Sequence, residues 1–324
     1  MIGRVCRDFL RSRPFLLAPI IGLRHFGRHR PARFSVRLSN DGERFVVRKG
    51  DQEIWLDSRH GGYANDVARE FDYYFESVLP EMVGSTAVAD FSGPKRHGVR
   101  GFDHKFLFSS LPEGGSTNRA YLESLKLAPG DVVIDAGAYC GLTAHVFARS
   151  VGPTGLIIAI EADPRNYSAL LENIEASGAT NIRPVRAAVW TAAGTLQFQA
   201  EGSMGSSLST TSPRHDALVD VRAATLLDIC RELGVEKVDH VKMDIEGAEY
   251  AVVLSSTEFI ERYRPDFIIE AHKDGESPVN VQKLANYFNL MGYTMTRLKQ
   301  SEAEIFPLLY FAPVSEREGV GLDG

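Results

Sequence analysis

The spacing of hydrophobic and polar positions changes near residue 117. Before that point, apolar and polar side chains alternate in short runs, with turn residues at 40–42 and 49–51, which predicts a small antiparallel meander. Residues 65–79 place apolar side chains at helical spacing and predict an amphipathic helix, whereas residues 80–116 predict short strands and loops. The meander strands are expected at 34–38, 45–48 and 53–56.

From residue 117 onward, short apolar runs alternate with longer segments of helical period. This alternation predicts an α/β fold with a mostly parallel, Rossmann-like sheet that is covered by helices on both faces. Predicted strands are 131–135, 156–161, 182–189, 240–244 and 266–270, an inserted pair is 195–199 with 218–221, and a C-terminal antiparallel hairpin is 293–297 with 305–311. Predicted helices are 142–150, 166–177, 248–254 and 279–291.

The chain is therefore expected to have four parts: a basic arm at 1–33, an N-terminal α+β extension at 34–116, an α/β domain at 117–312 and a tail at 313–324. The arm is rich in arginine, and apolar residues such as Ile2 and Phe9 share one side of a predicted helix. One interpretation is weak peripheral contact of residues 1–30 with an anionic membrane surface. The other is a frayed terminus, or a helix docked on its own domain.

Composition narrows the class of protein. The 324 residues are 44% hydrophobic and 24% charged, as in an ordinary soluble globular protein. The formal net charge of -6 argues against nucleic acid as a partner, because such binding needs a cationic face. No apolar run approaches the roughly 20 residues of a membrane span. The three cysteines form no disulfide or metal-binding pattern, which favours a reducing, cytoplasmic setting.

A glycine-containing loop follows the predicted strand at 131–135. In open α/β sheets, ligands bind at the carboxyl ends of the strands, where glycine lets the backbone approach them. The spacing Asp-x-Gly-x-x-x-Gly differs from the dinucleotide pattern, and the acid at Asp135 would repel a pyrophosphate. An acid suits a ligand that carries an ammonium group and hydroxyls, such as S-adenosylmethionine. Cofactor contacts are expected from Asp135, Gly137, Ala138 and Gly141.

The second predicted strand ends at Glu161, where an α/β nucleotide site places a carboxylate that accepts ribose hydroxyls. Asp163 follows at once and is expected to reach the adenosine, and Ala188, near the end of the third strand, is a further expected contact. Each residue alone is explained equally well by an ordinary turn or a solvated charge. Their occurrence at successive strand ends indicates a cofactor site.

A second group of polar residues follows the next two strands. Asp244 and Glu246 leave the strand at 240–244 and can hold the cofactor amine, position an acceptor or serve a cation, whereas Glu249 is explained as well by the helix dipole. Glu270 and His272 project to the same side if their strand persists. His272 is the best candidate base, so activity is expected to rise from mildly acidic to neutral pH as its ring deprotonates. The alternative is a structural histidine.

These stretches resemble the FkbM family of S-adenosylmethionine-dependent methyltransferases, over roughly residues 117–312. The block Lys-Met-Asp-Ile-Glu-Gly-Ala-Glu at 242–249 is specific, whereas the glycine loop marks only the wider superfamily. Tyr139 and Ala162 depart from the family pattern, which often has Asn and Pro there. The resemblance is carried by 133–138 with Gly141, by 161–164 with Leu170 and Asn173, by 238–249, by Arg264-Pro265, by 269–272 and by Gly292-Tyr293.

The resemblance implies a class I methyltransferase sheet, S-adenosylmethionine as cofactor, and O-methylation of a small-molecule or glycan acceptor such as a natural product or a sugar. Candidates for catalysis at the acceptor are Asp244, Glu246, Glu270 and His272, with no metal assigned. A metal-assisted methyltransferase with Asp244, Glu270 and His272 as ligands is an alternative, as is a non-catalytic cofactor-binding protein. A nicotinamide oxidoreductase is disfavoured by the glycine spacing and by Asp135.

Overall fold

A computed structural model describes residues 34–60, 63–112, 115–200, 202–203, 207–208, 218–272, 281–298 and 306–314. The chain divides into two compact units, residues 1–117 and 118–324. The basic arm at 1–33 lies outside the described residues, so its membrane contact stays a prediction. No helix in the described part of the chain is long and apolar enough to cross a bilayer.

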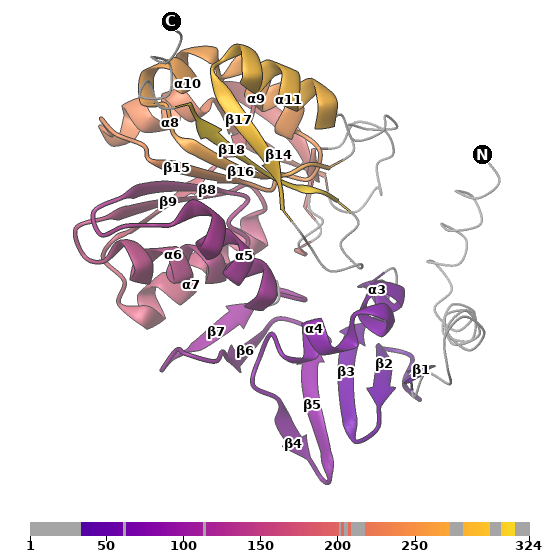
Figure 1. The fold of residues 1–324 in the computed structure, drawn as a ribbon. Helices are drawn as coiled ribbons and strands as arrows, with labels where there is room; N and C mark the ends of the chain where they lie inside the picture. Colours follow the sequence, from indigo (N-terminus) through magenta and orange to yellow (C-terminus); the bar gives the residue numbers. More distant parts are fainter. Residues whose placement is uncertain are drawn as a thin grey trace, which may run out of the picture. The chain divides into compact units, whose positions relative to one another are not determined.

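The first unit is built on a five-stranded sheet in the order β1-β2-β3-β5-β4 (Figure 1). The predicted meander is confirmed, because β1, β2 and β3 pair antiparallel, and β5 then pairs parallel with β3. The strands are β1 (Phe34–Leu38), β2 (Arg44–Lys49), β3 (Gln52–Asp57), β4 (Glu81–Val83) and β5 (Thr86–Phe91), and a separate antiparallel pair is β6 (Lys95–Gly98) with β7 (Lys105–Phe108).

The helix predicted at 65–79 is two shorter helices, α3 (Ala64–Arg69) and α4 (Phe71–Phe75), which follow the 3-10 turn η1 (Ser58–His60). The break lies at Glu70, whose backbone has φ -115° and ψ 40°. Phe71 and Phe75 are both buried, and their rings stack with centroids 5.4 Å apart. The aromatic face that predicted a helix is therefore packed as expected, on a shorter helix.

The second unit contains a seven-stranded sheet in the order β10-β9-β8-β15-β16-β18-β17. In chain order this is 3-2-1-4-5-7-6, with only β18 antiparallel to its neighbours. The predicted class I methyltransferase fold is confirmed by this arrangement. The strands are β8 (Val132–Ala136), β9 (Leu156–Glu161), β10 (Ile182–Arg186), β15 (His240–Met243), β16 (Asp266–Glu270), β17 (Tyr293–Arg297) and β18 (Leu308–Pro313).

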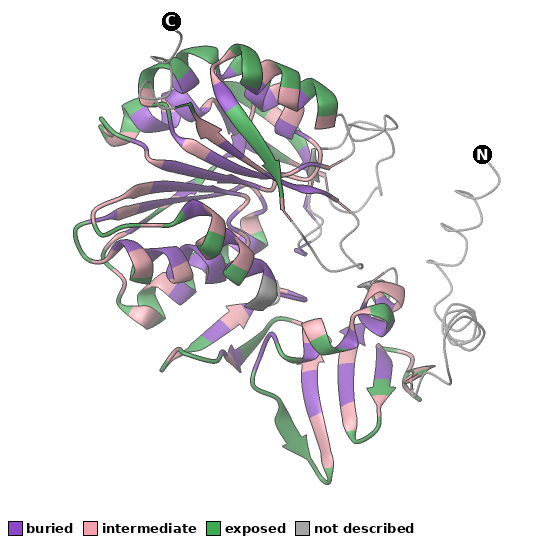
Figure 2. Cartoon of the chain, viewed as in Figure 1, coloured by how far each residue is buried: buried purple, intermediate pink, exposed green. Residues whose placement is uncertain are grey.

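Helices cover both faces of this sheet (Figure 1). One face of the sheet packs against apolar side chains of α5, α6 and α7, including Phe147 and Leu170. The other face packs against side chains of α8–α11, including Val252 and Phe288. The central strands β8, β9, β15 and β16 are almost entirely buried, whereas the edge strand β17 is mostly exposed (Figure 2). The helices are α5 (Gly115–Leu125), α6 (Leu142–Val151), α7 (Pro164–Ser177), α8 (Leu226–Leu233), α9 (Glu249–Ser255), α10 (Thr257–Tyr263) and α11 (Val281–Leu290).

The third core strand is shorter than the predicted 182–189. It ends at Arg186, and Ala188 lies in β11 (Ala188–Val189), which pairs parallel with β14 (Leu218–Ala224) in a separate four-stranded sheet. The predicted inserted pair is present there as β12 (Gly194–Gln199) antiparallel to β14, next to β13 (Ser207–Leu208). Ala188 is buried with Phe198 and Val221 of that sheet, so its side chain packs in a small core.

The helix α8 was not expected from the sequence pattern, although its ends carry clear signals. Thr225 and Asp228 form a reciprocal capping box at its start, and Gly234 ends it in the left-handed conformation. The helix is short and lies between two predicted strands, so periodicity alone did not reveal it.

A charge cluster around the buried His240 lies at the amino-terminal ends of β8, β15 and β16, three neighbouring strands of the seven-stranded sheet. His240 Nε2 lies 3.0 Å from Asp131 Oδ2, and His240 Nδ1 lies 3.6 Å from Asp266 Oδ2. Burial opposes a charged ring, but the carboxylates of Asp266 and Asp131 outweigh it and raise the pKa of His240.

We expect this cluster to stabilise the fold mainly at acidic to neutral pH. Because the folded-state pKa of His240 is raised, its contribution is complete below the unfolded-state pKa of about 6.5 and is lost as pH rises through the folded-state value. Urea unfolding of wild type and His240→Gln across this pH range measures the contribution of His240. That contribution is the difference between the free energies of unfolding of the two proteins. A difference that does not shrink with rising pH would contradict the expectation.

Candidate cofactor and acceptor site

The loop between β8 and α6 is shaped by two glycines with positive φ. Gly137 has φ +80°, and a Cβ built there would lie 1.8 Å from the backbone oxygen of Asp244. Gly141 has φ +85°, and its Cβ would lie 2.4 Å from Leu170 Cδ1. Only glycine fits these positions, since a side chain would meet backbone at one and the face of α7 at the other. The loops after β8 and β15 are therefore in direct contact.

Asp135, at the end of β8, is completely buried. Its Oδ1 lies 3.2 Å from Lys242 Nζ, and its Oδ2 makes no hydrogen bond to any described residue. Lys242 Nζ also donates to the backbone oxygen of Gly137, at 2.8 Å. Burial raises the pKa of Asp135, and the charge of Lys242 only partly offsets this. Lys242 thus ties the strand-end acid to the glycine loop, a role that sequence analysis did not assign.

Glu161, at the end of β9, holds the other side of this loop. Its Oε2 accepts the N–H of Tyr139 and its Oε1 accepts the N–H of Asp163, both at 2.8 Å. Each carboxylate oxygen has a second lone pair, so the side chain can still accept ribose hydroxyls. Burial raises the pKa of Glu161 to about 8, although both N–H groups favour the charged form.

Asp163 has an architectural role in the structure. Its Oδ1 accepts the N–H of Arg165 at the start of α7, and its Oδ2 accepts the N–H of Gly202, both at 2.8 Å. A direct contact of Asp163 with adenosine stays a prediction. Ala138 is buried in the loop, where its N–H donates to the Ile160 backbone oxygen at 2.9 Å. For Ala188, whose side chain packs in the four-stranded sheet, a cofactor contact also stays a prediction.

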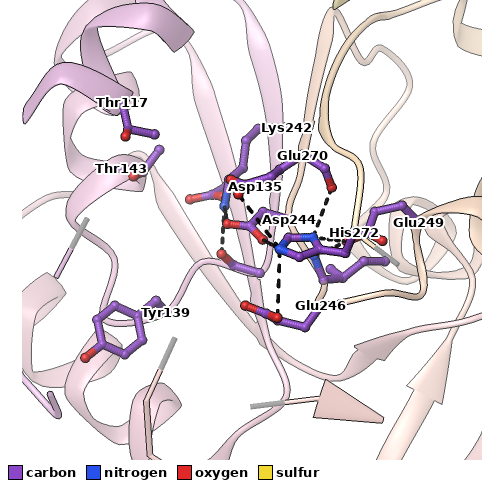
Figure 3. Close-up of polar contacts among 12 residues, drawn as sticks. Thr117, Asp135, Tyr139, Thr143, Lys242, Asp244, Glu246, Glu249, Glu270 and His272 are labelled. Carbon is purple, nitrogen blue, oxygen red and sulfur yellow. Dashed lines mark hydrogen bonds and ion pairs between the residues drawn. The ribbon is translucent and has the colours of Figure 1, made fainter. Parts of the chain in front are cut away.

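Four acidic side chains surround His272 at the ends of β15 and β16 (Figure 3). The ring Nδ1 lies 3.0 Å from Glu249 Oε1. The ring Nε2 lies 3.8 Å from a carboxylate oxygen of each of Asp244, Glu246 and Glu270. The structure therefore brings together all four residues that sequence analysis placed at the acceptor, and adds Glu249 as a fifth.

Glu249 shapes the loop between β15 and α9. Its buried carboxylate accepts the N–H of Ile245 at 3.0 Å and the N–H of Gly247 at 3.1 Å, while it also holds His272. Glu246, between those two residues, has φ +56°, which a non-glycine residue rarely adopts. Helix-dipole stabilisation was an equally good explanation of Glu249 from the sequence. Only the fold shows that its carboxylate fixes both the loop and the imidazole.

The surroundings of His272 change the expected pH range of a base. Burial disfavours the charged ring, but the hydrogen bond to Glu249 and the charges of Asp244 and Glu246 raise the pKa of His272 to about 10. One neighbouring acid had been expected, and the structure places four. Because these four acids favour the charged ring, a rise of activity between mildly acidic and neutral pH does not follow from this geometry.

Comparisons with known proteins identify the family of this chain. Residues 135–295 match the methyltransferase FkbM domain. The chain is an S-adenosylmethionine-dependent methyltransferase of the FkbM family. It is 27% identical over 169 residues to the 2-O-methyltransferase NoeI of Sinorhizobium fredii, a match that covers 47% of this chain and 68% of NoeI. The matched residues include both the glycine loop that begins at Asp135 and the acids around His272.

Two solved structures are also similar. The FkbM methyltransferase from Methylobacillus flagellatus is 18% identical, with a TM-score of 0.41, over 56% of this chain and 43% of that one. The fibrillarin from Aeropyrum pernix is 13% identical, with a TM-score of 0.40, over 83% of this chain and 94% of that one. The match with this FkbM methyltransferase thus spans less than half the length of the Methylobacillus enzyme.

We expect cofactor binding by this FkbM methyltransferase to depend on a charged Glu161. Proton loss provides the acceptor that ribose hydroxyls need, so affinity for S-adenosylhomocysteine should rise as pH increases through about 8. Glu161→Gln should bind about 10–100-fold more weakly and should not show this rise. Calorimetry at several pH values measures both, with Glu175→Gln on the exposed side of α7 as the control. Parallel pH profiles of wild type and Glu161→Gln would contradict this.

Proposed function

We propose that this enzyme methylates a hydroxyl oxygen of a small-molecule acceptor, such as a sugar in a glycan or a natural product. The observation that carries the proposal is the cluster of Asp244, Glu246, Glu270 and His272 beside the cofactor loop, since an aliphatic hydroxyl reacts poorly unless a base or a cation assists it. The name of the relative NoeI, a 2-O-methyltransferase, supports oxygen as the methylated atom.

The residues of the first loop fit the cofactor. The buried Oδ2 of Asp135 lacks a hydrogen-bond partner among the described residues, as expected of an acceptor reserved for a ligand ammonium group. Glu161 offers its remaining lone pairs to the ribose. When bound, S-adenosylmethionine supplies an activated methyl group on a positively charged sulfur. The protein then has mainly to align the acceptor, which can contribute roughly 7–11 kcal/mol to lowering the barrier.

Contact between the two loops supports this proposal. The Gly137 backbone lies against the Asp244 backbone, so the cofactor loop and the acid cluster share one edge of the sheet. With S-adenosylmethionine bound, an acceptor oxygen held at this edge would form the new C–O bond as the C–S bond broke and its electron pair stayed on sulfur. The hydroxyl proton leaves to a basic group of the cluster.

The experiment is a transfer assay with methyl-labelled cofactor and a panel of acceptors. Hydroxyl-bearing sugars and natural products should accept the label, and matched compounds with the reactive hydroxyl replaced by hydrogen should not. Product analysis should place the methyl group on oxygen. Transfer only to nitrogen or carbon, with no hydroxyl in the panel methylated, would overturn the proposal while leaving the enzyme a methyltransferase.

We further propose a cytoplasmic enzyme whose residues 1–30 make weak contact with anionic membranes. The arginines of this arm predict sedimentation with anionic liposomes that weakens as salt rises. A chain that begins at residue 31 should stay in the supernatant and keep its affinity for S-adenosylhomocysteine. Equal sedimentation of both chains would dispose of the membrane contact.

A further inference from the structure

We propose that Asp244, Glu246 and His272 form a binding site for a divalent cation of the Mn²⁺ class, which positions and activates the acceptor hydroxyl. One potential ligand atom from each residue lies within 4.8 Å of the other two. The role of the cation rests on the proposed methylation of a hydroxyl, but its binding does not, and the two can be tested apart.

The orientation of His272 is the first argument. Its Nδ1 lies 3.0 Å from Glu249 Oε1 and 3.1 Å from the backbone oxygen of Glu270, and both of these atoms can only accept a hydrogen bond. Nδ1 therefore carries a proton. In the neutral ring the lone pair is then on Nε2. Because Glu249 holds Nδ1, the ring is oriented so that Nε2 faces Asp244 and Glu246. A carboxylate that holds the far nitrogen is typical of metal-binding histidines.

The distances around Nε2 are the second argument. The His272 side chain is only 6% exposed, and its Nε2 lies 3.8 Å from oxygens of Asp244 and Glu246. This separation is too long for a hydrogen bond from a protonated Nε2. Metal–ligand distances near 2.1 Å place adjacent ligand atoms about 3 Å apart and opposite ones about 4.2 Å apart. The observed separations of 3.8 Å lie between these two values, so shifts of less than about 1 Å would seat an octahedral cation between these atoms.

The composition and exposure of the site indicate the kind of cation. Carboxylate oxygens suit Mg²⁺ and Mn²⁺, whereas imidazole favours transition metals, and Mn²⁺ accepts both. The side chains of Asp244 and Glu246 are 18% and 28% exposed, so the protein does not enclose the site. Three protein ligands leave positions for water or for the oxygen atoms of an acceptor, as in catalytic metal sites.

Glu270 has a different role in this proposal. Its Oε1 also lies 3.8 Å from His272 Nε2, at the end of β16, so it stands beside the three ligands. A cation held by those ligands lowers the pKa of the acceptor hydroxyl. The hydroxyl proton passes to Glu270 as the oxygen lone pair forms the C–O bond, and the C–S electron pair stays on sulfur to leave a neutral thioether. Charge and atoms balance without an added reactant.

The test measures cation binding directly. Full-length enzyme treated with chelator and then dialysed is titrated with Mn²⁺, and electron paramagnetic resonance follows the free ion. We expect one Mn²⁺ per chain. Asp244→Asn and His272→Ala should remove this binding, and Glu249→Gln should weaken it about 10–100-fold, the usual effect of losing the residue that orients a metal-binding histidine. Glu258→Gln, on the exposed side of α10, should bind Mn²⁺ as wild type does.

Further measurements separate folding and function from cation binding. His272→Ala, Glu249→Gln and Glu270→Gln should keep their affinity for S-adenosylhomocysteine, which shows that the cofactor site is folded. Glu270→Gln should bind Mn²⁺ normally but transfer methyl groups about 10²–10⁴-fold more slowly. Wild-type enzyme that leaves the free Mn²⁺ signal unchanged, or that methylates a hydroxyl equally well in chelator, would overturn the cation site and leave O-methylation intact. Binding of Mn²⁺ without transfer to any hydroxyl would retain the site and overturn only its proposed role.

Discussion

Replacing His272 with alanine is expected to lower the turnover rate about 10²–10⁴-fold, the usual effect of removing a group that assists proton transfer. The imidazole faces Asp244, Glu246 and Glu270, so its loss affects the acceptor side of the site whether it holds a cation or a proton. Affinity for S-adenosylhomocysteine should barely change, because Asp135 and Glu161 lie at the ends of two other strands, β8 and β9. Single-turnover assays with labelled cofactor and calorimetry measure the two effects.

The chain offers a matched control for this variant. His240 is also a buried imidazole between carboxylates, but it lies at the opposite edge of the sheet, beside Asp131 and Asp266. His240→Ala should lower stability and leave the turnover rate of the folded enzyme close to wild type. Near-normal turnover in His272→Ala, together with loss of turnover in Asp244→Asn or Glu246→Gln, would move catalysis to the loop after β15 and make His272 structural.

Gly137→Ala is expected to have the largest effect on the cofactor site. The added Cβ would lie 1.8 Å from the Asp244 backbone oxygen, and neither strand end can move without breaking the pairing of β8 with β15. The loop must therefore separate from Asp244. We expect affinity for S-adenosylhomocysteine to fall at least about 100-fold, which is roughly 2.7 kcal/mol, and the free energy of unfolding to fall by about 3 kcal/mol or more.

Gly178→Ala separates the steric contact from backbone strain. Gly178 ends α7 with φ +65°, and a Cβ there would meet no atom within 4 Å. This variant should lose about 1–2 kcal/mol of stability from its left-handed backbone and keep its cofactor affinity. Calorimetry and urea unfolding of both variants make the comparison. Equal losses in the two would show that the contact between Gly137 and Asp244 does not shape the site.

Local sequence patterns were enough to predict the main strands and helices of the second unit and the residues at their ends. The strand 132–136 with its glycines, and Glu161 at the end of β9, combine signals that lie within a few residues of one another. Alternation of apolar runs with helical periods predicted a mostly parallel sheet for the same reason. Some local signals were also overlooked, such as the capping box of Thr225 and Asp228 that begins α8.

Other elements depended on competition between local preference and packing. The helix predicted at 65–79 breaks at Glu70, and the strand predicted at 182–189 ends at Arg186. In the second case apolar residues continue from Ala187 to Val189, but Ala188 and Val189 pair with β14 in another sheet. An apolar run shows that residues will be buried, whereas the available partner decides which sheet buries them.

The chemistry of the site depended on contacts between distant parts of the chain. The sequence by itself determined which acids and which histidine stand at strand ends, because strand ends follow from local periodicity. Only the tertiary structure placed β15 between β8 and β16, and so put Lys242 against Gly137 and His272 against Glu249. The pKa of about 10 at His272 arises from that placement, since charges act through distance and burial rather than through separation along the chain.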